Sequence, residues 1–144
     1  MSTQNYENHA KIDFLYHRVL FTIFLFTLIG AGVNLYHSIG DHQRLYSASL
    51  ILVIVVTLIM TALFARVYAL KAQDRAIRAE ENFRHYVLTG KALDARLTVK
   101  QIVALRFASD GEFAELAQKA AASGMEPKAI KQAIKNWKAD NDRL

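Results

Sequence analysis

The 144-residue sequence contains no cysteine and only one proline, Pro127. Without cysteine the chain cannot form disulfides, thiolate zinc sites or iron–sulfur clusters, and it has no cysteine nucleophile. Charge is scarce in the first 65 residues, which hold 3 of the 18 basic and 3 of the 13 acidic side chains. The net charge of +5 and the mean hydropathy of +0.11 are therefore averages over two unlike halves.

Two segments of the first half, residues 19–37 and 45–65, have no formally charged side chain. A helix rises about 1.5 Å per residue and a bilayer core is about 30 Å thick, so each segment is long enough to cross it. The connection, residues 38–44, is short and suits a tight antiparallel hairpin. The sequence therefore predicts an all-α fold that contains a membrane helical hairpin.

Basic residues flank the two predicted spans unevenly. Lys11 and Arg18 precede the first span, Arg44 alone lies in the connection, and five follow the second span: Arg66, Lys71, Arg75, Arg78 and Arg84. The positive-inside rule then places residues 1–18 and 66–144 in the cytoplasm and residues 38–44 outside. We expect a multi-pass protein of the cytoplasmic membrane with both termini cytoplasmic, in contact with the lipid bilayer.

Small residues recur at one-turn spacing within the spans, where they let helix backbones approach closely. They are Thr27, Gly30 and Ala31 in the first span and Thr57, Thr61 and Ala65 in the second. Such a face either packs the two helices of the hairpin together or docks another subunit or a second copy of the chain. The spans lack Asp, Glu, Lys and Arg, which disfavours a transporter with intramembrane ionisable groups.

The second span is expected to continue as a juxtamembrane helix over residues 66–89, because no helix breaker occurs before Gly90. Residues at alternating spacings of three and four form what we call the juxtamembrane stripe: Ala69, Ala72, Ala76, Ala79, Phe83 and Tyr86. The stripe favours a close partner helix, either from the C-terminal domain or from another chain. Four basic residues beside the membrane are expected to attract anionic lipid headgroups: Arg66, Lys71, Arg75 and Arg78.

Residues 90–144 are expected to form a small cytoplasmic helical domain of three short helices. Capping boxes open the first two, at Thr98 with Gln101 and at Ser109 with Glu112. Gly124 is expected to end the second helix. The predicted core consists of Ile102, Leu105, Phe107, Phe113, Leu116, Ala120, Met125, Ile130, Ile134 and Trp137.

Pro127 suits the first turn of the third helix, which we expect to run through residues 128–140. With the preceding helix it has the outline of a helix-turn-helix, whose second helix carries Lys128, Lys131, Lys135 and Lys138. Nucleic acid is one conceivable ligand, since phosphate contacts supply much of such affinity. The same spacing is typical of a solvated helix face, so nucleic-acid binding is the less favoured interpretation.

Neither a cofactor site nor an active site is indicated by the sequence. The histidines have no ligand spacing on one helix face: His9, His17, His37, His42 and His85. No phosphate-binding loop, nucleophile elbow or zinc-protease motif occurs. We therefore expect no metal, no cofactor, no small-molecule substrate and no enzymatic activity.

Several strings along the chain carry a family resemblance: QNYENHAK, LYSASL, ALKAQDRAIRAEENFRHYVLTGKALDARLT, QIVALRFASD and AIKQAIKNWKAD. With them the sequence resembles a family of small bacterial membrane proteins of unknown function. The resemblance implies two transmembrane helices and a cytoplasmic helical tail, and it implies no activity. The hypotheses on function come from the residues described above and not from the resemblance. The favoured one is a non-enzymatic accessory or scaffold subunit of a larger membrane complex. The alternatives are a membrane-tethered nucleic-acid binder and a homo-oligomeric channel or sensor.

Overall fold

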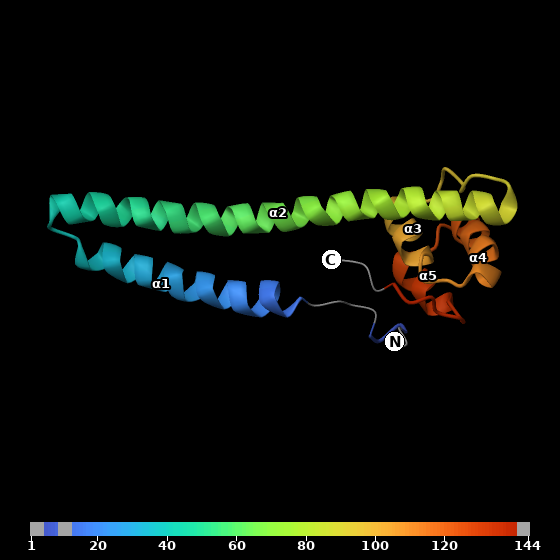
Figure 1. Cartoon of the computed structure of the whole chain (residues 1–144), viewed down its shortest axis with the longest axis horizontal. Helices are drawn as coiled ribbons and strands as arrows, with labels where there is room; N and C mark the ends of the chain where they lie inside the picture. Colours follow the sequence, from blue (N-terminus) through green and yellow to red (C-terminus); the bar gives the residue numbers. More distant parts are fainter. Residues whose placement is uncertain (1–4, 9–12, 141–144) are drawn as a thin grey trace. The chain divides into compact units, whose positions relative to one another are not determined.

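The computed structural model describes residues 5–8 and 13–140, and the regular elements in this part of the chain are helical (Figure 1). The predicted all-α fold is thus confirmed. A π-helix, η1, opens the order, and five α-helices follow: η1 Leu15–Leu20, α1 Phe21–His37, α2 His42–Thr89, α3 Val99–Leu105, α4 Asp110–Ser123 and α5 Pro127–Ala133. The described residues fall into two compact units: the hairpin unit, residues 13–69, and the helical unit, residues 70–140 together with residues 5–8.

The hairpin unit contains two helices that are long and apolar enough to cross a membrane, Leu15–His37 and α2. The first begins four residues before the predicted span. α2 begins at His42 because the carboxylate of Asp41 accepts hydrogen bonds from the backbone N–H groups of Gln43 and Arg44, at 3.2 and 3.1 Å. This carboxylate takes up N–H groups that have no partner inside the helix.

The two helices of the hairpin unit pack along one face of each. Ala31 of α1 and both Ala48 and Val55 of α2 are buried. The hydroxyl of Tyr16 donates a hydrogen bond to the carbonyl oxygen of Ala62 at 2.9 Å, which fixes the antiparallel register near the start of the first helix. The guanidinium of Arg66 lies over the same tyrosine ring, 5.4 Å from its centroid.

α2 continues without interruption from the hairpin unit into the helical unit, as the sequence predicts. It ends at Thr89, and Gly90 follows with a φ of +72°. A residue with a side chain adopts this left-handed conformation only at a cost, which is why glycine stops the helix here.

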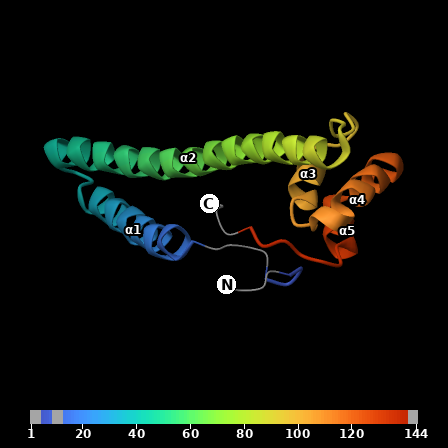
Figure 2. The ribbon, with the colours of Figure 1, turned by 45° about the vertical axis from the view of Figure 1, so that its right-hand side comes forward.

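The helical unit consists of the last turns of α2 and the short helices α3, α4 and α5 (Figure 2). The capping box of α3 is confirmed: the Thr98 hydroxyl accepts the N–H of Gln101 at 3.3 Å, and the Gln101 side chain accepts the N–H of Thr98 at 2.8 Å. Gly124 ends α4 with a φ of +61°, and Pro127 occupies the first turn of α5, both as predicted.

Two local predictions for this unit are wrong. Ser109 precedes α4, but its hydroxyl makes no capping hydrogen bond with the helix backbone. α5 ends at Ala133 instead of continuing to residue 140. The chain beyond it is extended and pairs with the segment before α4. The backbone N–H of Lys138 donates to the carbonyl oxygen of Phe107 at 2.7 Å, and the backbone N–H of Ser109 donates to the carbonyl oxygen of Asn136 at 3.0 Å.

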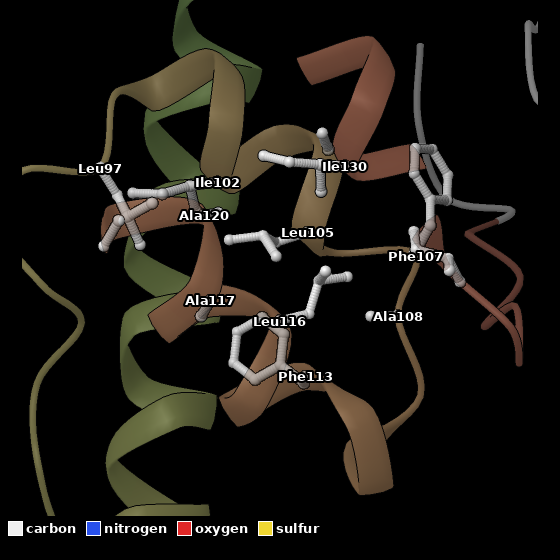
Figure 3. Packing of buried hydrophobic residues seen from close by; sticks show 13 residues of the cluster. Leu97, Ile102, Leu105, Phe107, Ala108, Phe113, Leu116, Ala117, Ala120 and Ile130 are labelled. Atoms are coloured by element: carbon white, nitrogen blue, oxygen red, sulfur yellow. The ribbon is translucent and has the colours of Figure 1, made fainter. Parts of the chain in front are cut away.

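The core of the helical unit lies among α3, α4 and α5 (Figure 3). Its largest fully buried side chains are Phe107, Phe113, Leu105 and Ile130. The other predicted core residues also belong to it, with Met125 and Trp137 partly buried at its edge. Burial of one such side chain stabilises a fold by about 1.5–3 kcal/mol, so the apolar pattern of the sequence accounts for the assembly of this unit.

Candidate docking surface

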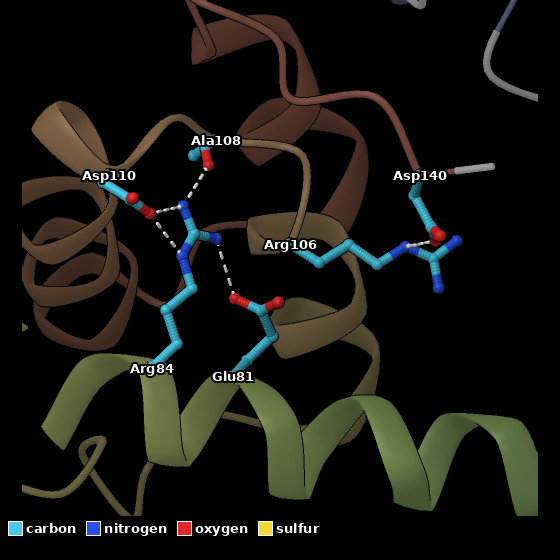
Figure 4. A network of polar contacts seen from close by, with 6 residues as sticks. All are labelled: Glu81, Arg84, Arg106, Ala108, Asp110 and Asp140. Carbon is cyan, nitrogen blue, oxygen red and sulfur yellow. Dashed lines mark hydrogen bonds and ion pairs between the residues drawn. The ribbon is translucent and has the colours of Figure 1, made fainter. Parts of the chain in front are cut away.

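Arg84 of α2 joins this helix to the rest of the helical unit (Figure 4). Its Nη1 lies 2.9 Å from the Glu81 carboxylate, its Nη2 lies 2.6 Å from Asp110, and Nη2 also donates to the carbonyl oxygen of Ala108 at 2.7 Å. The guanidinium stacks over the Phe113 ring. Because the Arg84 side chain is only 12% exposed, these contacts hold a charge that has lost most of its water.

Neighbouring side chains of α2 extend this contact. The side-chain oxygen of Asn82 accepts the N–H of Leu93 at 2.9 Å, and His85 Nδ1 lies 2.7 Å from the carbonyl oxygen of Lys91. Ile77 and Glu81 are buried. The face of α2 that carries Ile77, Glu81 and Arg84 is therefore the face that the rest of the unit covers.

The juxtamembrane stripe lies on another face of the same helix. At about 100° per residue, Phe83 is turned about 120° from Ile77 around the helix axis, and Tyr86 about 180°. Phe83 is 68% exposed and Tyr86 is 59% exposed. Ala72, Ala76 and Ala79 are exposed as well, whereas Ala69 is partly buried. The C-terminal helices, which were one of the two partners that the sequence left open for the stripe, thus pack on a different face of α2.

Charged side chains border the exposed stripe. Arg75 lies on one side of it and Glu80 on the other, and both are exposed. Among the residues proposed to meet lipid headgroups, Lys71, Arg75 and Arg78 are exposed, whereas Arg66 is partly buried against Tyr16. The stripe and its borders form an apolar strip between charged edges, which is the pattern of a helix that packs against another helix.

The small residues of the two spans are mostly outside the contact between the hairpin helices. Ala31 is buried in it, while the remaining five are exposed: Thr27, Gly30, Thr57, Thr61 and Ala65. The three threonine hydroxyls each donate to a carbonyl oxygen four residues earlier at 2.8 Å. Sequence reasoning missed the residues that do pack, although Leu45, Ala48, Leu52, Val55, Ile59 and Ala62 show the same three–four spacing.

The four lysines of the predicted helix-turn-helix do not share one helix face. Because α5 ends at Ala133, Lys135 and Lys138 lie in the extended segment after it. Lys131 is partly buried, and its Nζ lies 5.7 Å from the centroid of the Phe107 ring. α5 is also only seven residues long, which leaves no room for a recognition helix of ordinary length.

An open cavity of about 520 Å³ lies between the end of α2 and α4, lined by His85, Asp94, Leu97, Glu115 and others. Two of its polar side chains have partners within the chain: His85 contacts the backbone of Lys91, and Asp94 pairs with Arg96. Across residues 5–8 and 13–140, no three histidine or carboxylate side chains are grouped so as to hold a metal ion. His9 lies outside the described residues.

The segment between α2 and α3 carries a fork between Arg96 and Asp94. Arg96 Nη2 lies 2.7 Å from one carboxylate oxygen of Asp94 and Nε lies 3.0 Å from the other. Hydrogen bonds from the side chain and the backbone of Arg96 lower the pKa of Asp94 from 3.8 to about 2, and Asp94 raises the pKa of Arg96. Both side chains are exposed, and the Asp94 carboxylate also accepts the backbone N–H of Arg96 in the turn before α3.

Comparison with known proteins places the chain in one family. Residues 1–144 match the model of the family of unknown function DUF6526. No curated protein and no solved structure matches the chain.

Proposed function

Because the chain belongs to this family of unknown function over residues 1–144, we propose a function from its own surfaces: a non-enzymatic accessory or scaffold subunit of the bacterial cytoplasmic membrane. The hairpin unit anchors the subunit in the bilayer. The helical unit, on the cytoplasmic side, offers a docking surface to a larger membrane protein complex. Each part of this proposal is supported by a different set of residues.

The exposure of the hairpin helices supports the anchor. Only 6% and 11% of the apolar stretches of the two candidate spans are buried within the chain. Large side chains such as Phe26, Val53 and Leu58 point away from the helix contact, and each is more than half exposed. A soluble protein rarely leaves so much contiguous apolar surface in water, whereas lipid chains would cover it.

The distribution of charge supports the orientation. Arg44 is the one basic residue of the connection, while Arg66, Lys71, Arg75 and Arg78 follow the second span on α2. This excess favours a cytoplasmic position for the helical unit. The same basic groups would lie within reach of anionic lipid headgroups, where each would strengthen membrane binding by up to about 1 kcal/mol.

The exposed apolar end of the juxtamembrane stripe carries the docking part of the proposal. Phe83 and Tyr86 of the stripe and the neighbouring Val87 are each more than half exposed. All three lie within three residues of Arg84, whose side chain is mostly buried beside Glu81. Aromatic side chains that stay in contact with water next to a well-packed unit are typical of protein–protein contact sites.

A photo-crosslinking amino acid at Phe83, introduced in native membranes, tests the docking proposal. We expect a crosslinked product with another membrane protein chain, which mass spectrometry identifies as a different protein or as a second copy, and no such product when the probe replaces Arg78, an exposed residue outside the stripe. A chain that crosslinks to nothing from Phe83 and purifies alone in mild detergent would refute the proposal.

The orientation is tested separately with single cysteines, since the natural chain has none. A maleimide that does not cross membranes should label Gln43→Cys in intact spheroplasts and should label Lys119→Cys only after lysis. The reverse pattern would overturn the proposed topology while leaving the membrane anchor intact.

A further inference from the structure

The juxtamembrane stripe follows a heptad pattern in which two positions of every seven face a partner helix. Ala69, Ala76 and Phe83 occupy the first of these positions, and Ala72, Ala79 and Tyr86 occupy the second. Alanine at most of these positions would let a partner backbone approach closely. The two aromatic side chains at the far end would supply larger contact areas.

The helical unit leaves this face free for a partner. Ile77, Glu81 and Arg84, which contact the rest of the unit, occupy heptad positions on the far side of α2 from the stripe. At the edges of the covered face, Ala76 borders a hollow shared with Arg106 and Asp140. Ala79 borders another, shared with Leu93 and Ile102. A second helix would lie along the stripe between these two hollows.

The charges beside the stripe identify the partner. In a parallel pair of helices, the residue that directly precedes a first heptad position on one helix lies near a residue of the other helix five positions further along. That second residue directly follows the next second heptad position. Arg75 and Glu80 occupy these two positions, five residues apart. Both are exposed, and neither forms an ion pair with another described residue. Two copies of α2 would thus join by two Arg75–Glu80 pairs related by a twofold axis.

The membrane anchor fixes the direction of the two helices. Two copies inserted in one bilayer with the same topology can only run parallel along α2, and parallel is the arrangement in which Arg75 meets Glu80. Confinement to the membrane also raises the effective concentration of the two helices, so a short contact suffices.

We propose that the juxtamembrane stripe binds a second copy of this chain, as a parallel pair of α2 helices with Arg75 of each copy beside Glu80 of the other. The proposal rests on the proposed membrane anchoring and names the partner of the same surface. The resulting dimer would present two helical units to a larger complex.

Cysteine crosslinking of the full chain in native membranes tests the contact, because no natural cysteine interferes. Under mild oxidation we expect a disulfide-linked dimer of Ala79→Cys and at most about a tenth of that yield for the neighbouring exposed control Arg78→Cys. Equal yields from the two variants would overturn the proposal, because random collisions in the membrane would explain them.

Charge exchange tests the register of the pair. In the Ala79→Cys background, Arg75→Glu and Glu80→Arg should each lower the dimer yield by about fivefold, because each places like charges opposite one another. The double variant with both exchanges should restore the yield. A double variant that stays as low as the single ones would overturn the register.

The photo-crosslinker at Phe83 separates this proposal from the proposed function. A product with a second copy supports the dimer, whereas products only with a different membrane protein overturn the dimer and leave the docking role standing. The absence of both products, with no cysteine-linked dimer, refutes both.

Discussion

The guanidinium of Arg84 on α2 lies 4.4 Å from the centroid of the Phe113 ring on α4. Its charge is held by Glu81 and Asp110, and it also donates to the carbonyl oxygen of Ala108. One side chain thus contacts an aromatic ring, two carboxylates and a backbone carbonyl. Arg84 thereby links the last turns of α2 to the segment before α4 and to α4 itself.

Replacement of Arg84 by alanine should destabilise the helical unit by about 2–3 kcal/mol, because Glu81 and the Ala108 carbonyl would lose their buried partner. Hydrogen exchange of the α3 and α4 amides in the full chain, held in detergent micelles, measures this loss. Arg78→Ala, an exposed control on the same helix, should change protection by less than about 0.5 kcal/mol. Equal effects of the two substitutions would show that the cluster does not stabilise the unit.

Glu112 is expected to stabilise the extended segment after α5. Its carboxylate accepts the backbone N–H groups of Lys135 and Asn136, at 3.1 and 2.9 Å. Glu112→Ala should lower the exchange protection of these two amides by about 1–2 kcal/mol. Glu115→Ala, an exposed position one turn along the same helix, serves as the control and should leave both amides protected.

The two predicted capping boxes should respond differently to the same substitution. Thr98→Ala removes a formed cap and should cost about 1 kcal/mol of stability. Ser109→Ala should cost less than about 0.5 kcal/mol, since the Ser109 hydroxyl makes no capping hydrogen bond with α4. Thermal or exchange measurements that rank Ser109→Ala above Thr98→Ala would contradict the structure.

Acid titration should reveal the fork between Asp94 and Arg96. The pKa of Asp94 is lowered to about 2 in the folded chain, so its contribution to stability is present above its ordinary value of 3.8 and is lost as the pH falls through about 2. Carbon-13 NMR of labelled aspartate in the full chain, assigned with Asp94→Asn, follows this titration. Arg96→Gln should return the pKa of Asp94 toward 3.8, and Arg75→Gln should leave it unchanged.

Local rules account for much of the helical unit. The stop at Gly90, the cap at Thr98 and the start at Pro127 depend on backbone dihedrals and hydrogen bonds within a few residues, which the sequence displays directly. The cap predicted at Ser109 failed for a long-range reason. Glu112 binds backbone groups of Lys135 and Asn136, which lie more than 20 residues away.

The end of α5 also depended on distant residues. Helix-forming residues continue beyond Ala133, yet the chain turns extended so that Trp137 lies 5.2 Å from Phe107, between ring centroids, and pairs with Ala108. Packing of an aromatic side chain on the core outweighed a weak local preference for helix. No spacing pattern in residues 128–140 carried that information.

The sequence by itself determined the all-α class, the two long apolar helices, the continuity of α2 and most of the buried core, because each follows from periodicity and composition along one segment. Only the tertiary structure decided which face of α2 meets the small helices. The stripe and the Ile77, Glu81 and Arg84 face are both regular patterns on one helix. Arg84 favours one of them, because its guanidinium reaches Asp110 and the Ala108 carbonyl from that face.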